Sequence, residues 1–103
     1  RPLKEIVFAP EDTPEAAVLA QAEYGHPAVF ALEVALYRLI EHWGVRRDVV
    51  FGCSNGDSAV LHVAGMLSLA DAAVVVTTRG RLLQETPQGG TMVAIEASED
   101  EVR

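Results

Sequence analysis

The sequence is poor in several residue types, and each shortage excludes a class of protein. Its 103 residues contain a single cysteine, so the chain cannot hold an internal disulfide framework. It contains no Cys/His cluster with the spacing of a zinc site, and we expect no metal centre. No purely apolar run exceeds residues 72–76, whereas a membrane-spanning helix needs about 20 consecutive apolar residues. These shortages indicate a soluble protein of a reducing compartment, and we expect it in the cytoplasm.

Basic residues are also few. The chain has 8 Lys and Arg residues against 15 Asp and Glu residues, which gives a formal net charge of -7. A surface with this charge repels phosphate backbones and anionic lipid headgroups, so we expect neither nucleic acid nor membrane as a partner. Half of the residues are apolar, which is enough for a packed core and excludes a disordered chain.

Apolar side chains recur every three or four residues along much of the chain and predict helices. The spacing favours an amphipathic helix over residues 27–43, with Pro27 near its first turn, and another helix over residues 69–85. Ser68 is expected to cap the second of these, and a capping box that opens at Ser98 predicts the start of one more. The apolar face of the first helix is expected to pack in the core, through Leu36, Leu39 and Trp43.

Two short segments predict β-strands. Residues 48–52 are apolar and β-branched without alternation, which is typical of a strand buried on both faces of a parallel sheet. Residues 91–97 predict a second strand, after a turn over residues 86–90. The order helix, strand, helix, helix, strand predicts an α/β fold, part of a hydrolase-like domain with a parallel sheet.

The most informative pattern in the chain is Gly52-x-Ser54-x-Gly56. It is the pattern of a nucleophile elbow, in which a strand turns sharply into a helix and exposes a serine hydroxyl. The helix would here cover residues 55–64. We expect a strained backbone at Ser54 and a backbone N–H of Asn55 that can donate to an oxyanion. An inert tight turn is the alternative.

Six separated stretches, taken in order, resemble the acyltransferase (malonyl-transacylase-like) domain of modular type I polyketide synthases. They are YGHPAVFALE (24–33), WGV (43–45), GCSNGD (52–57), HVAGMLSL (62–69), RGRLLQ (79–84) and GTMVAI (90–95). The resemblance covers nearly all of the chain. It implies that residues 1–103 are a central fragment of one such domain. The family's N-terminal glycine-rich strand motif and its C-terminal part, which carries the general-base histidine, have no counterpart here.

The resemblance assigns roles to individual residues. Ser54 matches the acyl-enzyme nucleophile, and Arg79 matches the arginine that pairs with the free carboxylate of the extender unit. Three further residues are assigned to the oxyanion pocket: His26, Cys53 and Asn55. The chain departs from the family pattern at four positions. It has His26 for glutamine, Cys53 for histidine, Asn55 for an apolar residue or glutamine, and Asp57 for glutamate.

The resemblance implies transfer of a malonyl-type extender unit from coenzyme A, through a seryl ester, to the phosphopantetheine thiol of an acyl carrier protein. No cofactor is bound in this reaction. The implied partners are the carrier protein and the remainder of the same synthase chain. We expect the isolated 103 residues to be inactive, because none of the three histidines is well placed as a base.

Two other interpretations stay open. A non-catalytic, degenerate acyltransferase-like segment is favoured by the four departures around Ser54. A serine esterase of the α/β-hydrolase type would have the same elbow. An enzyme for neutral esters, however, has no need of a carboxylate anchor such as Arg79.

Overall fold

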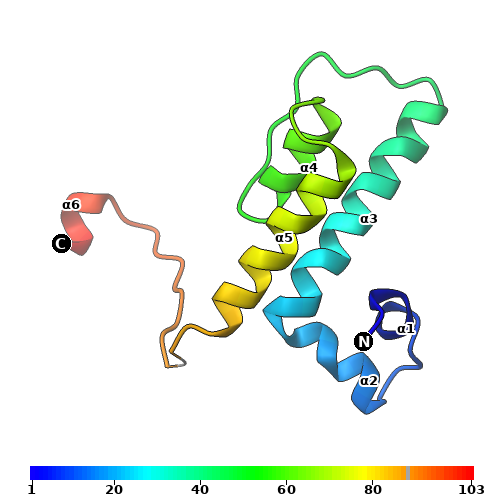
Figure 1. Cartoon of the computed structure of the whole chain (residues 1–103). Helices are drawn as coiled ribbons and strands as arrows, with labels where there is room; N and C mark the ends of the chain where they lie inside the picture. Colours follow the sequence, from blue (N-terminus) through cyan, green and yellow to red (C-terminus); the bar gives the residue numbers. More distant parts are fainter. Residues whose placement is uncertain (88) are drawn as a thin grey trace.

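The computed structural model of the chain describes residues 1–87 and 89–103, and helices are the regular secondary structure that these residues form (Figure 1). In chain order they are α1 (Leu3–Val7), α2 (Pro14–Ala17), the 3-10 turn η1 (Val18–Ala20), α3 (Ala22–His42), α4 (Gly56–Val63), α5 (Leu69–Gln84) and α6 (Glu99–Val102). No helix in this part of the chain combines the length and the hydropathy that crossing a membrane requires.

Helices α3, α4 and α5 form the packed part of the molecule. The first and last of these lie side by side, and α4 packs against both (Figure 1). Their shared core consists of Phe30, Ala59, Ala72 and Val76, with Val34 and Leu67 packed against it. Small side chains at this core allow the helix backbones to approach one another closely.

Local caps and long-range contacts together fix the helix ends. Ser68 Oγ accepts a hydrogen bond from Asp71 N–H at 3.0 Å, so the predicted cap of α5 is confirmed. Helix α3 begins at Ala22 rather than near residue 27, because Gln84 Oε1 at the end of α5 accepts from Ala22 N–H at 2.8 Å. Pro27 therefore lies inside α3 and is buried there.

The predicted capping box at the start of α6 is also confirmed. The hydroxyl and the N–H of Ser98 both donate to Glu101 Oε2, at 2.7 and 2.8 Å. The bond from the Ser98 hydroxyl, followed by that from its N–H, lowers the pKa of the Glu101 carboxyl. The contribution of this cap is therefore present while Glu101 is ionised and is lost as the pH falls through the lowered pKa.

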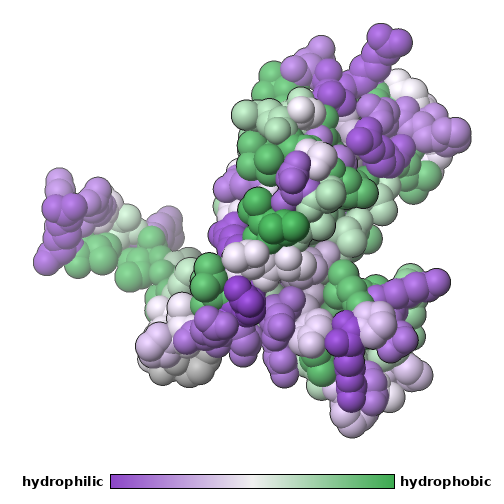
Figure 2. Space-filling view, viewed as in Figure 1, coloured by the Kyte–Doolittle hydropathy of each residue, from purple (hydrophilic) through white to green (hydrophobic). Residues whose placement is uncertain are grey.

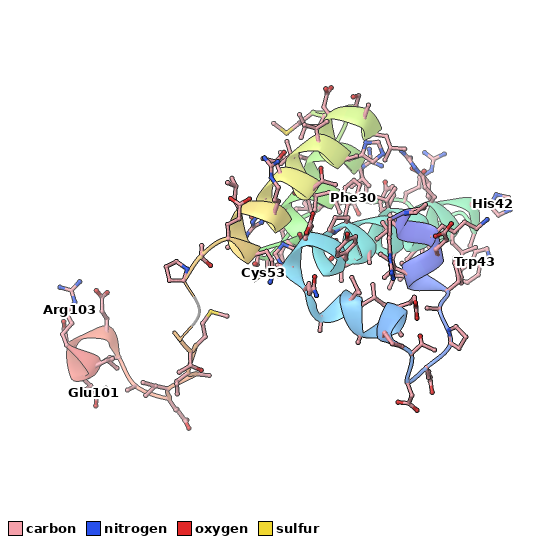
Figure 3. The ribbon with its side chains drawn as sticks, turned by 60° about the horizontal axis from the view of Figure 1, so that its bottom comes forward. Phe30, His42, Trp43, Cys53, Glu101 and Arg103 are labelled. Carbon is pink, nitrogen blue, oxygen red and sulfur yellow. The ribbon has the colours of Figure 1, made fainter. Side chains whose placement is uncertain are left out.

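The predicted strands are wrong for the described residues. Neither residues 48–52 nor residues 91–97 form a strand, and Val49 and Phe51 are 81% and 90% exposed instead of buried. A strand is held by hydrogen bonds to a neighbouring strand, and the two segments do not meet. Figures 1 and 3 show residues 91–97 in an arm that extends away from the packed helices. The predicted turn over residues 86–90 lies partly outside the described residues, since it contains residue 88.

The apolar face of α3 is covered along only part of its length. Three residues expected in the core are exposed: Leu36, Leu39 and Trp43, the last to 69%. The prediction for them is wrong because α3 packs against its neighbours through Phe30 and Val34. Figure 2 shows that apolar side chains also lie on the surface of the packed helices.

The core assignment predicts a difference between two phenylalanines. Phe30 is 5% exposed and Phe8 is 77% exposed. We expect Phe30→Ala to lower the free energy of unfolding by about 3 kcal/mol, because it leaves a cavity between α3 and α5. Phe8→Ala is the matched control, with a loss below about 0.5 kcal/mol. Urea denaturation monitored by circular dichroism measures both, and equal losses would contradict the packing described.

Candidate active site at the turn before α4

A strained turn connects the extended segment around residue 51 to helix α4. Ser54 has a φ of 55°, in the left-handed region that side chains other than that of glycine rarely adopt. Helix α4 begins two positions later at Gly56, with Asn55 as its N-cap residue. The predicted strained backbone at Ser54 is therefore present, and so is the helix that follows it. The strand expected before it is absent from the described residues.

The two glycines of the pattern have different roles. A Cβ atom at Gly52 would lie 2.6 Å from the backbone carbon of Gly56 and 2.7 Å from Asp57 N. No side chain fits there, because backbone atoms cannot move aside as the end of a side chain can. A Cβ atom at Gly56 would meet only Glu33 Oε1 at 3.6 Å, which is an ordinary contact. Close packing therefore requires glycine at the first position of the pattern but not at the second.

Arg79 reaches the turn from helix α5. Its Nη1 donates to the Ser54 carbonyl oxygen at 2.9 Å, and its Nη2 lies 3.4 Å from Ser54 Oγ. The guanidinium is half-buried, whereas Ser54 is exposed. A cation thus lies directly beside the serine hydroxyl, which is where an anionic group of a bound molecule could be paired.

The sequence interpretation missed the residues that hold Arg79 in this place. Gly80 is buried, and a Cβ atom there would lie 2.5 Å from the Ala22 carbonyl oxygen of α3. Together with the bond between Gln84 and Ala22, this contact brings α5 close to the start of α3. The only sequence signal was a glycine inside a helix, where it costs about 1 kcal/mol relative to alanine unless packing requires it.

The N-terminus of α4 presents a backbone donor next to the serine. Three backbone N–H groups there donate to the carbonyl oxygen three residues earlier in the chain, at 3.0 to 3.3 Å. They are the N–H groups of Gly56, Asp57 and Ser58. Within the described part of the chain, the N–H of Asn55 donates to no protein acceptor. A free N–H at a helix N-terminus favours a negatively charged oxygen.

The structure brings His26 to the same turn. Asn55 Nδ2 donates to the His26 carbonyl oxygen of α3 at 3.1 Å. The His26 ring is half-buried, and its Nδ1 is a buried atom without a hydrogen-bond partner among the described residues. Cys53 has an exposed thiol at the start of the turn. All the residues that the sequence assigned to the site therefore lie at or beside it.

The other two histidines are elsewhere. The ring of His62 is engaged through Nδ1 with the Leu67 carbonyl oxygen at 3.1 Å. His42 lies in the last turn of α3, and Figure 3 shows it with Trp43 at the far end of this helix from Cys53. Among residues 1–87 and 89–103, no three His, Cys, Asp or Glu side chains converge to hold a metal ion.

The backbone strain at Ser54 predicts an unusual order of stabilities. Ser54→Gly and Ser54→Ala both remove the hydroxyl, but only alanine keeps a Cβ atom in the left-handed region. We expect the glycine variant to be more stable by about 1 kcal/mol. At Ser58, inside α4, the order is expected to reverse, because alanine is the better helix former. Chemical denaturation of the four variants measures this, and the same order at both positions would contradict the strained turn.

Comparisons with known proteins identify the family. The family model described as "Acyl transferase domain" matches residues 3–103. The chain is 52% identical over its whole length to polyketide synthase GfsA of Streptomyces halstedii and 50% identical to mycoketide-CoA synthase of Mycobacterium tuberculosis. It is 45% identical, over 99% of its length, to the PKS-NRPS hybrid synthetase ATPKS of Aspergillus niger.

The chain spans only a small part of these relatives. It covers 1% of the Streptomyces protein, 2% of the mycobacterial protein and 6% of the Aspergillus protein. No solved structure matches it. The family model matches almost the whole chain, and the relatives from bacteria and a fungus share about half of its residues. The chain therefore belongs to the acyl transferase domain family, as an acyltransferase domain segment like those of polyketide synthases.

Proposed function

We propose that this chain loads a malonyl-type extender unit onto Ser54 as part of a longer polyketide synthase in the cytoplasm. The acyl group comes from its coenzyme A thioester and passes on to the phosphopantetheine thiol of an acyl carrier protein. The observation that carries the proposal is the contact between the Arg79 guanidinium and Ser54, through both the carbonyl oxygen and the hydroxyl. A nucleophile beside a fixed cation suits an acyl group that carries its own carboxylate.

The reaction takes place in two balanced steps. Ser54 Oγ attacks the thioester carbonyl carbon, its proton passes to a base, and the coenzyme A thiolate leaves and takes up a proton. The thiol of the carrier protein then attacks the seryl ester, and Ser54 recovers its proton. In both steps negative charge develops on the acyl oxygen, and the N–H of Asn55 is the donor that we assign to it.

We propose that the base comes from outside the 103 residues. His62 is engaged with the Leu67 carbonyl oxygen, and His42 lies at the far end of α3. His26 is near the turn, but its backbone carbonyl is the group that contacts Asn55. This supports the expectation from the resemblance that a histidine beyond Arg103 accepts the serine proton, and that the isolated chain is inactive.

A non-catalytic segment is the second candidate function. The observation in its favour is the set of departures from the family pattern around Ser54: His26, Cys53, Asn55 and Asp57. None of these changes removes the hydroxyl, the guanidinium or the N-terminal N–H of α4. Labelling of the serine distinguishes the two candidates.

We expect the intact protein to take up label from radiolabelled malonyl-coenzyme A in a form that survives denaturation. Ser54→Ala should abolish this label, because only the Ser54 hydroxyl forms the ester. Ser98→Ala, an exposed serine at the start of α6, is the matched control and should be labelled like the wild type. Purified residues 1–103 should remain unlabelled. An intact protein that takes up no label would show that the segment is non-catalytic.

Arg79 predicts a preference for carboxylated acyl groups. We expect Arg79→Ala to slow loading from malonyl-coenzyme A on the order of 10- to 100-fold, because the variant lacks a charge-assisted pair. Loading from a monocarboxylic thioester such as acetyl-coenzyme A should fall by no more than about fivefold, the effect of the lost bond to the Ser54 carbonyl. Single-turnover acylation measures both rates.

The control for this comparison is two residues away on the same helix. Arg81 is exposed and forms a surface ion pair with Glu85 at 3.9 Å. Arg81→Ala should therefore load both thioesters at the rate of the wild type. Equal losses with both thioesters in Arg79→Ala would show that this arginine supports the fold and does not select the substrate.

A further inference from the structure

The side chain of Asn55 connects the turn to a helix that lies far from it in the sequence. Its Nδ2 donates to the His26 carbonyl oxygen at 3.1 Å, across a separation of 29 residues. The carboxamide orientation is determined by chemistry, because a carbonyl oxygen can only accept a hydrogen bond. The side chain is half-buried, so the bond is partly protected from competition by water.

The orientation of the amide leaves its other atom without a partner. Asn55 Oδ1 is buried and accepts no hydrogen bond from the described residues. An unpaired buried acceptor lowers stability, so this side chain is not an optimal choice for the fold alone. An apolar residue of similar size would avoid the unpaired oxygen, at the expense of the bond to His26.

Few contacts between elements hold the strained turn. Arg79 holds the Ser54 carbonyl from α5, and Asn55 holds the next residue to α3. Among the described residues, the turn is thus hydrogen-bonded to both long helices, through the two Arg79 donors on Ser54 and through Asn55 Nδ2. The Ser54 carbonyl that accepts from Arg79 belongs to the peptide that joins Ser54 to Asn55. These bonds fix the direction of that peptide, whose N–H is the donor beside the serine hydroxyl.

We propose that Asn55 is a positioning residue, whose carboxamide anchors the turn to α3 and so aims its own backbone N–H at the acyl oxygen. The side chain itself does not touch the substrate. This inference rests on the proposed function for its effect on the reaction rate. The anchoring of the turn can be measured without any activity.

The test compares Asn55→Leu with the wild type in the intact protein. Leucine has a similar size, lacks the donor and removes the unpaired Oδ1, so the fold as a whole should be retained. We expect amide hydrogen exchange at residues 54–58 to become about tenfold faster, as loss of one hydrogen bond implies. Exchange in α5 should stay unchanged. Loading from malonyl-coenzyme A should show kcat about tenfold lower, with KM within twofold of the wild type.

Two further variants make the result specific. Asn55→Gln keeps an amide donor, and we expect it to bring exchange and kcat back to within about threefold of the wild type. Ile6→Val is the control for general destabilisation, because Ile6 is buried in α1. None of the bonds that hold the turn, from Arg79 to Ser54 and from Asn55 to His26, involves Ile6. It should change neither exchange at residues 54–58 nor kcat.

The proposal is overturned if Asn55→Leu leaves exchange at the turn unchanged, whatever happens to kcat. It is equally overturned if Ile6→Val accelerates this exchange as much as Asn55→Leu does, or if Asn55→Gln behaves like the leucine variant. Failure of the wild type to become labelled would refute the proposed function instead. The exchange comparison would still decide whether Asn55 anchors the turn.

Discussion

The hydrogen bond from Arg79 to the Ser54 carbonyl oxygen connects helix α5 to the turn that carries the serine. Ser54 has a left-handed backbone, which costs about 1–2 kcal/mol for a residue with a side chain, and neighbouring contacts must offset that cost. The guanidinium of α5 supplies one such contact, and the close approach of Gly52 to α4 supplies another. Because Arg79 also lies 3.4 Å from the hydroxyl, the group that stabilises the turn is the group that we assign to the substrate carboxylate.

The placement of Arg79 depends on how α5 packs against α3. The core around Phe30 and Val76 holds the two helices together, and Gly80 allows their backbones to approach near Ala22. Arg79 directly precedes Gly80, so the same close approach sets the position of its guanidinium. A change in the helix packing is therefore transmitted to the serine through Arg79.

Features that depend on neighbouring residues could be predicted from the sequence. The strain at Ser54, the cap at Ser68 and the capping box at Ser98 each depend on residues within a few positions. The strands could not be predicted correctly, because a strand forms only where another strand pairs with it, and none does so among the described residues. The bonds from Asn55 to His26 and from Ala22 to Gln84 had no local signal. The position of Arg79 beside Ser54 followed from the family resemblance and not from any spacing.

The most direct measurement is a crystal structure of the intact domain trapped after reaction with malonyl-coenzyme A. We predict continuous density from Ser54 Oγ into a malonyl ester, a φ of Ser54 near 55° and the free carboxylate on the Arg79 guanidinium. An acyl group on Cys53 or on another residue, or an arginine turned away from a loaded serine, would contradict this account of the site.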